Sequence, residues 1–449
     1  MTRRRDFLRQ VCGSAAAWGF AGSLGRFGMV NALAQSSTPN YKALVCIFLF
    51  GGNDGNNLIV PMSSYSSYAG IRGPLALAQN TLLQAAAVTG GATYGFHPNL
   101  PGLQQLFTSK KLAIVANVGT LVKFLSRDQY QQGSVPVPFN LFSHADQQTE
   151  WQTGIPASGA RSGWGGRVAD AISFMNLPAT FPTGLSVAGN SSFLNGVTTV
   201  PTALIPGSNP GLAGSTGSTA ANARDASFQQ LLTFNSGLTL VQSANAVTTE
   251  GLNVANVLKS VLSGNNTLTT VFPNSTLGQE LQQVASIIKV RAALNMNRQV
   301  FFVSLGGFDT HTNQIADQGA LFTDLSASLL AFYNATVELG VDQQVTTFTE
   351  SDFGRTFQPS SGGGSDHAWG SHHLVMGSAV KGGDVYGSFP EFALGSPNDA
   401  DNRGVWIPTT ALDQFGATLA AWFGLGMTDL NTVFPDLANY TPTTNLGFV

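Results

Sequence analysis

Six histidines lie in short motifs rich in Gly, Asp and Ser, although only 10% of the 449 residues are charged. Four of them fall within residues 311–373, where Glu350, Asp352 and Asp366 are interleaved with them and Asp309 precedes them. Histidine is the commonest metal ligand and titrates near neutral pH. Carboxylates supply the oxygen ligands that divalent ions need. This grouping predicts a metal centre or an acid–base site.

Two of these motifs place charged side chains close together. Asp309 and His311, in GGFDTHTNQ, are two residues apart, so on an extended segment they share one face and could hold one ion. The alternative is a helix N-cap role for Asp309 or Thr312. Asp352, in ESDFGRT, is a similar candidate ligand, and Arg355 could either pair with it or hold an anion.

The motif SDHAWGSHH adds three histidines after a Ser- and Gly-rich loop at 360–365. Loops that carry such side chains beside carboxylates are more often functional than structural. We expect His367 and His372 to be metal ligands. Of the neighbours His372 and His373, we expect only one to point inward and the other to bond to the backbone.

Three further motifs precede or follow predicted elements. Asp54, in FGGNDGNN, is flanked by glycines that permit close approach of a ligand, or it simply holds a tight turn. Ser143, in FSHAD, is either a helix N-cap with Asp146 or a nucleophile at a helix N-terminus, with His144 beside it. Arg167, in GWGGR, is available for an anion.

Four apolar or β-branched runs predict buried strands, at 43–50, 112–118, 299–305 and 344–349. Such runs favour central parallel strands that are covered on both faces. Asp54, Asp309 and Asp352 each follow one of them. Because ligands in open α/β sheets bind beyond the carboxyl ends of the strands, these carboxylates should meet at one edge.

Helical spacing of apolar residues predicts helices at 277–294, 313–339 and 412–423. The expected fold is therefore α/β, with a mostly parallel central sheet and helices on both faces. Residues 190–274 are rich in Ser, Thr, Asn and Gly and predict a cap or insertion with helices of its own, such as 225–238. We expect residues 35–449 to form a single domain.

The first 34 residues predict an export signal. Arg3, Arg4 and Arg5 open an R-R-x-F-L pattern, a short apolar run follows, and Ala32-Leu33-Ala34 offers a cleavage site. This pattern is typical of a twin-arginine signal, with an ordinary secretory signal as the alternative, and is too weak for a stable membrane span. We expect a periplasmic or secreted protein that uses the twin-arginine export machinery. A net charge of −3 gives no indication of nucleic-acid binding.

Together with this leader, an ordered set of segments resembles an exported bacterial family, domain-of-unknown-function 1501. The segments are FLFGGNDGNNLIVP, FHPNLPGL, LFSHADQQTEWQTG, GWGGRVAD, GGFDTHTNQ, TESDFGRTFQ, GSDHAWGSHHLVMG and DQFGATLAAWFG. That family is distantly similar to the alkaline phosphatase and sulfatase superfamily. The resemblance implies an alkaline-phosphatase-like sheet with one or two divalent ions, such as Zn, Mn or Ca, at the carboxyl ends of its strands.

The resemblance also implies roles for single residues. Asp54 matches the superfamily's strand-end metal ligand, and Asp309 with His311 resembles its later Asp and His pair. Phe353 stands where a ligand His or Asn would be, so that ligand would come from His367 or His372, or be absent.

Two functions follow from these expectations. The first is an exported metal-dependent hydrolase of small-molecule or polymer phosphate or sulfate esters, with Ser143 as the nucleophile and Arg167 or Arg355 on the ester oxygens. A formylglycine sulfatase is disfavoured because the C-x-P-x-R motif is missing at Cys46. The alternative is a non-catalytic binding or assembly protein on the same fold, in contact with glycans or surface polymer, which Phe353 favours.

Overall fold

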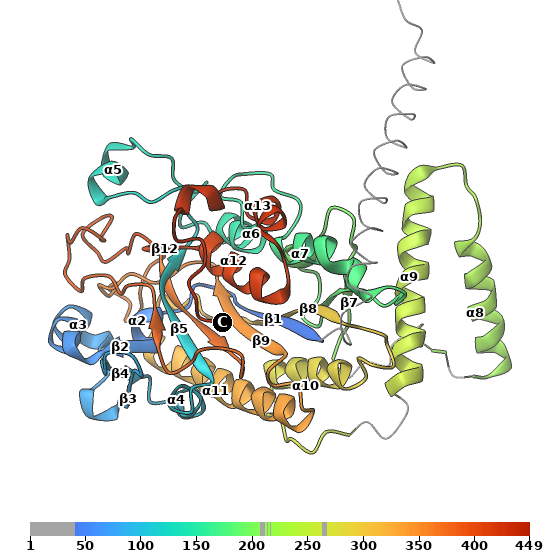
Figure 1. Ribbon diagram of the computed structural model, residues 1–449, viewed down its shortest axis with the longest axis horizontal. Helices are drawn as coiled ribbons and strands as arrows, with labels where there is room; N and C mark the ends of the chain where they lie inside the picture. The colour runs from blue at the N-terminus through green and yellow to red at the C-terminus, as the bar shows by residue number, and fades with distance from the viewer. Residues whose placement is uncertain (1–40, 207–211, 213, 216, 263–266) are drawn as a thin grey trace, which may run out of the picture.

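The computed structural model describes residues 41–206, 212, 214–215, 217–262 and 267–449. The predicted export signal lies outside these residues. A nine-stranded sheet runs through the molecule in the order β11-β5-β10-β9-β1-β8-β6-β7, with β12 beside β5 (Figure 1). Its strands are β1 (Lys42–Leu49), β5 (Leu112–Gly119), β6 (Gly184–Ser186), β7 (Thr202–Ala203), β8 (Arg298–Leu305), β9 (Val345–Ser351), β10 (Ser371–Met376), β11 (Val385–Tyr386) and β12 (Thr410–Ala411).

The sheet is mostly parallel, as predicted. The central strand β1 pairs in parallel with both β8 and β9. β6 pairs in parallel with β8 and β7, and β10 runs antiparallel to both β5 and β9. All four strands predicted from the sequence are present, and three of them are neighbours in the sheet.

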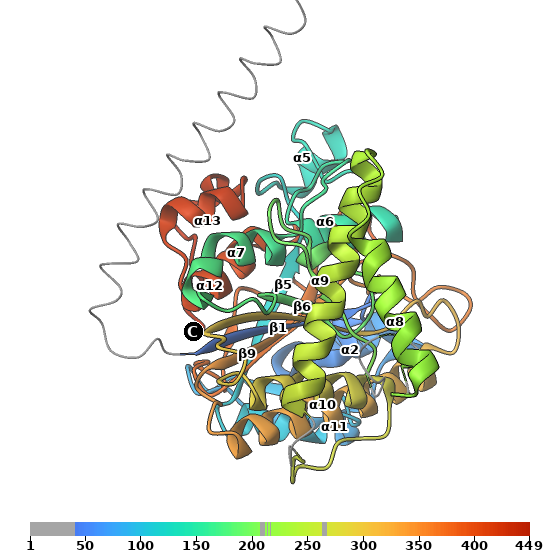
Figure 2. The ribbon, with the colours of Figure 1, turned by 90° about the vertical axis from the view of Figure 1, so that its right-hand side faces the viewer.

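Helices cover both faces of the sheet, and β1 shows why. Its side chains alternate, so Ala43, Val45 and Ile47 enter one core and Leu44, Cys46 and Phe48 enter the other. The first face is covered by α4 (Pro101–Thr108), α10 (Thr276–Lys289) and α11 (Gln314–Glu338) (Figures 1 and 2). The second face is covered by α6 (His144–Thr153), α7 (Trp164–Ile172), α12 (Leu412–Phe423) and α13 (Met427–Val433).

The segment 190–274 contributes both to the sheet and to a projection. It supplies the edge strand β7 and a pair of helices, α8 (Thr219–Leu232) and α9 (Thr239–Leu262), that stand beside the body of the protein (Figures 1 and 2). The predicted helix at 225–238 begins earlier, because Ser218 caps α8 by accepting a hydrogen bond from the amide of Ala221, and it also ends earlier, at Leu232.

A smaller antiparallel sheet, in the order β2-β4-β3, completes the fold together with short helices. These elements are α2 (Gly55–Leu58), β2 (Ile59–Pro61), α3 (Tyr65–Arg72), β3 (Leu83–Ala86), β4 (Thr93–Phe96) and α5 (Arg127–Gln132). Within the described part of the chain, no helix is both long and apolar enough to cross a membrane.

The parallel strands bring three turns to one edge of the sheet. Leu49, at the end of β1, is in register with Leu305 of β8 and Ser351 of β9. The turns that carry Asp54, Asp309 and the Asp352 region therefore start side by side, as the strand pattern predicts.

Candidate metal centre

Three histidines surround Asp309 at this edge of the sheet. One carboxylate oxygen of Asp309 lies 3.1 Å from His311 Nε2 and 3.3 Å from His367 Nε2. Its other oxygen lies 3.4 Å from His144 Nε2. We call Asp309, His144, His311 and His367 the histidine cluster. Ligand atoms of His144, Asp309 and His367 all lie within 4.8 Å of one another.

Each histidine of the cluster is held through its other ring nitrogen by an oxygen atom. His144 Nδ1 lies 2.7 Å from Asp352 Oδ2, His311 Nδ1 lies 3.2 Å from Asp366 Oδ1, and His367 Nδ1 lies 2.7 Å from the carbonyl of Phe142. Since these oxygens accept hydrogen bonds, each Nδ1 is a hydrogen-bond donor, and in the neutral ring Nε2 is then free to bind a metal ion. This is the usual arrangement of histidines that bind metals.

The Nε2 atoms of the three histidines lie close to one another and to Asp309. His144 Nε2 is buried without a hydrogen-bond partner among the described residues. His311 Nε2 and His367 Nε2 face each other at 3.1 Å, and two lone pairs repel at this distance unless a proton or metal ion lies between them. Nitrogen ligands 2.0–2.1 Å from a tetrahedral Zn²⁺ lie about 3.3 Å apart. The spacing of His144, Asp309 and His367 is therefore compatible with the ligands of a single divalent ion.

Arg355 fixes Asp309 in place. Its fully buried guanidinium donates to Asp309 Oδ1 at 2.6 Å and to the carbonyls of Gly51, Gly52, Phe308 and Ser365. With its donors used in this way, Arg355 ties together the turns that follow β1, β8 and β9. We assign it a positioning role for Asp309, in place of the expected contact with ester oxygens.

The charge state of the cluster favours ligation at neutral pH. Partial burial alone would raise the pKa of Asp309, but the hydrogen bond and charge of Arg355 outweigh it, so the pKa lies below its usual value. Burial lowers the pKa of His367 below its usual value, and this shift exceeds the opposing effect of the Phe142 carbonyl. Both side chains are thus in the deprotonated form that a metal ion requires.

Phe353 packs against two histidines of the cluster. Its ring stacks on that of His367, with centroids 4.6 Å apart, and also contacts the ring of His144 at 4.8 Å. His144 on α6 and His367 in the loop before β10 thus lie beside Phe353, the position at which the resemblance implies a ligand histidine or asparagine. His144 therefore belongs with the candidate ligands, although the sequence suggested a role beside Ser143.

Ser143 makes a local contact instead of facing the cluster through a hydrogen bond. It occupies the N-cap position of α6 but makes no side-chain bond to the helix backbone. Its hydroxyl donates to Asp146 at 2.7 Å. Among the described residues, no Ser, Thr or Cys side chain is hydrogen-bonded to a side chain of the cluster.

Asp54, an expected ligand, has its oxygens occupied. The carboxylate is fully buried and forms an ion pair with Arg72, which is also buried. Gln314 donates to the same oxygen at 2.6 Å, and the other oxygen accepts from the amide of Asn56. Because an arginine neutralises this carboxylate, we assign Asp54 to the scaffold of the edge instead of to the metal ligands.

The histidines of β10, His372 and His373, have partners outside the histidine cluster. His372 lies on β10, is buried, and accepts a hydrogen bond from the amide of Asn117 through Nδ1, and burial lowers its pKa to about 3. Its neighbour His373 is buried as well and packs on Trp151. Both histidines are thus buried, and His372 bonds to the backbone, as we expected of one of the two.

The guanidinium of Arg167 is likewise committed to the backbone. It donates to the carbonyls of Thr153, Ser162 and Val433, and so links α6, α7 and α13. We therefore assign Arg167 a structural role, in place of the expected role in holding an anion.

The structure adds two residues that sequence reasoning missed. Gln148, one helical turn after His144, donates to Asp352 Oδ2 at 2.8 Å and helps to orient it. Arg403, 39% exposed, pairs with Asp366 at 2.5 Å and brings a positive charge to the rim of the cluster. The spacing of His144 and Gln148 was the available signal, since residues four apart share one face of a helix.

Comparison with known proteins identifies the family. Residues 41–401 match the family described as "Protein of unknown function (DUF1501)". The chain belongs to this family. Among curated proteins, none matches it. The family predicted from the twin-arginine leader and the ordered motifs is thus confirmed.

Among solved structures, similar chains include a protein of the alkaline phosphatase superfamily from Vibrio parahaemolyticus (11% identity, 87% of this chain and 68% of that chain covered, TM-score 0.33). The sulfatase PsFucS1 from Pseudoalteromonas sp. (9%, 88% and 70%, 0.34) and the lipoteichoic acid synthase LtaP from Listeria monocytogenes (8%, 83% and 75%, 0.32) are also similar. At these scores the likeness assigns no activity to this chain.

The contact between Asp352 and His144 leads to a testable prediction. Asp352→Asn keeps the shape of the side chain but removes the charge that holds the Nδ1 proton of His144. We expect Zn²⁺ affinity, measured by competition with a chromogenic chelator, to fall by about 10- to 100-fold. Asp146→Asn, on the first turn of the same helix, is the matched control and should leave affinity unchanged. Equal affinities for both variants would contradict the assigned role.

Proposed function

We propose that this protein is an exported metal-dependent hydrolase of phosphate or sulfate esters. The observation that carries the proposal is that His144, His311 and His367 turn their Nε2 atoms toward Asp309 while oxygen atoms accept a hydrogen bond from each Nδ1. Such an arrangement at the carboxyl ends of parallel strands, 24–47% exposed, is open to a small substrate.

The residues of the cluster have separable tasks in this proposal. His144, His367 and Asp309 would hold the ion, and His311 would complete the ligands or hold a second ion. A bound divalent ion supplies Lewis acidity toward the ester oxygens. Arg403, at the exposed rim, would offset the charge of an anionic ester in place of Arg167 and Arg355.

Attack by water is favoured over a covalent serine intermediate. Ser143 donates its hydroxyl to Asp146, and none of the cluster side chains is bonded to a hydroxyl or thiol side chain in the described part of the chain. The substrate would thus be cleaved by direct displacement, with the histidine cluster fixing the position of the ester.

The site of action proposed is the periplasm or the exterior of the cell. The R-R-x-F-L pattern at residues 4–8 supports this proposal, because twin-arginine export carries folded proteins and permits an ion to be inserted before export. The partner implied is the twin-arginine machinery. Removal of residues 1–34 is expected to retain the protein in the cytoplasm, as cell fractionation would show.

The function is tested by assaying p-nitrophenyl phosphate and sulfate with the metal-free protein after addition of Zn²⁺, Mn²⁺ or Ca²⁺. We expect one of these ions to restore hydrolysis and His367→Ala to lower kcat/KM by more than about 100-fold, since it removes a ligand. Ser143→Ala should retain most of the activity. If Ser143→Ala is as inactive as His367→Ala, the mechanism with direct attack by water is rejected in favour of one in which Ser143 is the nucleophile.

A non-catalytic binding protein is the second candidate. The absence of a nucleophilic side chain bonded to the cluster, among the described residues, favours it. In that case all three ions would bind without hydrolysis of either ester, and the metal would serve to hold an anionic ligand.

A further inference from the structure

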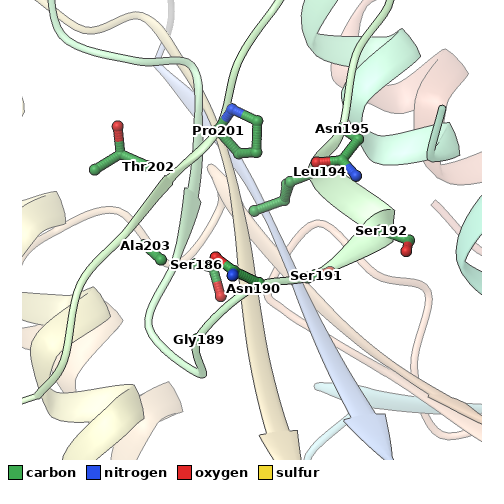
Figure 3. A pocket seen from close by; sticks show the side chains of 10 residues that line it. All are labelled: Ser186, Gly189, Asn190, Ser191, Ser192, Leu194, Asn195, Pro201, Thr202 and Ala203. Atoms are coloured by element: carbon green, nitrogen blue, oxygen red, sulfur yellow. The ribbon is translucent and has the colours of Figure 1, made fainter. Parts of the chain in front are cut away.

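A hollow of about 350 Å³ lies at the carboxyl ends of β6 and β7, in the loop that joins these strands (Figure 3). Its volume is within the range of small-molecule sites, roughly 300–1,000 Å³. The residues that line it are Ser186, Gly189, Asn190, Ser191, Ser192, Leu194, Asn195, Pro201, Thr202 and Ala203. None of these ten side chains carries a charge.

The polar side chains of the hollow are largely free to bind a ligand. The side chains of Asn190, Ser192, Asn195 and Thr202 make no hydrogen bond within the described part of the chain, and Asn190, Ser192 and Asn195 are exposed. Each amide or hydroxyl both donates and accepts hydrogen bonds. The group therefore suits a ligand that presents several uncharged hydroxyls, and it offers nothing to neutralise an anion or a cation.

Apolar surface lies among these groups. Pro201 and Ala203 border the same hollow, whereas the side chain of Leu194 is buried in the protein core (Figure 3). A sugar ring has C–H groups on its faces and hydroxyls around its edge, so it needs both kinds of surface in one site. A simple alcohol or a hydrocarbon would leave one kind unused.

The wall of the hollow is anchored to the helix that carries His144. Gln152, on α6, accepts hydrogen bonds from Ser191 Oγ at 3.2 Å and from the amide of Phe193 at 3.1 Å. Gln152 follows His144 by eight positions, which corresponds to about 12 Å along the helix axis. The hollow is thus a separate site, and α6 holds both its wall and the histidine cluster.

We propose that this hollow binds a neutral saccharide unit. Asn190, Ser192, Asn195 and Thr202 bond to its hydroxyls, and Pro201 with Ala203 packs against its ring. The binding does not rest on the proposed hydrolysis, because no lining residue belongs to the histidine cluster.

The test uses the mature chain and three neutral trisaccharides, of glucose, galactose and N-acetylglucosamine, with trigalacturonate as the charged comparison. Binding is followed by isothermal titration calorimetry and by saturation-transfer NMR, with and without EDTA. We expect at least one neutral trisaccharide to bind in both conditions and more tightly than trigalacturonate. Asn195→Ala combined with Ser192→Ala removes two hydrogen-bonding groups and should weaken binding about tenfold.

Ala203→Trp fills the hollow and should abolish binding. Val197→Trp is its matched control, because Val197 lies on the same loop, is 77% exposed and does not line the hollow. Thermal unfolding verifies that each variant is folded. The proposal is overturned if no neutral trisaccharide binds, if trigalacturonate binds as tightly, or if folded Ala203→Trp binds like Val197→Trp. Loss of hydrolysis with retained saccharide binding would reject the proposed function alone.

Discussion

Asp309→Ala is expected to lose the bound divalent ion. Asp309 lies 3.1–3.4 Å from all three histidines of the cluster, so its removal takes away both a ligand and the charge that balances the ion. Loss of a residue that only orients a ligand costs about 10- to 100-fold in affinity, so loss of Asp309 should cost more than about 100-fold. Titration of the metal-free protein with Zn²⁺, followed by calorimetry, measures this change.

Two controls separate loss of the ion from loss of the fold. Asp317→Ala removes an acidic residue from the first turn of α11 that lies outside the cluster, and should bind Zn²⁺ as the unaltered protein does. Circular dichroism should show Asp309→Ala to be folded, because Asp309 is 47% exposed and the guanidinium of Arg355 keeps its four backbone carbonyl partners. Unchanged affinity in a folded Asp309→Ala variant would reject the metal centre.

Asp54→Ala is expected to destabilise the protein strongly. Asp54 and Arg72 form a fully buried ion pair, and removal of one partner leaves the other charge buried without compensation. Such a loss costs about 3–5 kcal/mol. Denaturant unfolding, with the slope of the transition compared between variants, measures the free energy of unfolding.

The double variant Asp54→Ala with Arg72→Met tests the cause of this effect. Since both charges are gone, it should be more stable than Asp54→Ala alone. A folded Asp54→Asn variant should still bind Zn²⁺, because Asp54 is paired with Arg72 and not with the cluster. If the Zn²⁺ affinity of Asp54→Asn falls as much as that of Asp309→Ala, Asp54 is a metal ligand, as the sequence motif suggested.

The strands and the acidic turns after them could be predicted because their signals are local. The runs at 43–50, 299–305 and 344–349 consist mostly of apolar or β-branched residues, and parallel strands with such patterns bring their carboxyl ends together. Asp54, Asp309 and Asp352 were identified from that rule, and His311 from its two-residue spacing to Asp309. The helices at 313–339 and 412–423 followed from spacing alone and agree with α11 and α12.

The partners of these residues could not be predicted, because they come from distant parts of the chain. His144 and Gln148 reach Asp352 only through the packing of α6 on the second face of the sheet. In the same way, the charge of Asp54 is neutralised by Arg72 on α3. Arg167 donates hydrogen bonds to the backbone carbonyls of Thr153, Ser162 and Val433, of which Val433 is distant in the sequence. The motif FSHAD reads equally well as a helix start, so its histidine carried no separate signal.

Anomalous diffraction from crystals grown with Zn²⁺, or with Mn²⁺, tests the metal centre most directly. We predict a peak about 2.0–2.3 Å from His144 Nε2, His367 Nε2 and an oxygen of Asp309. Data collected above and below the absorption edge identify the ion. Crystals of the protein loaded with each ion that show no peak between these three residues, or peaks only at other positions, would contradict the account.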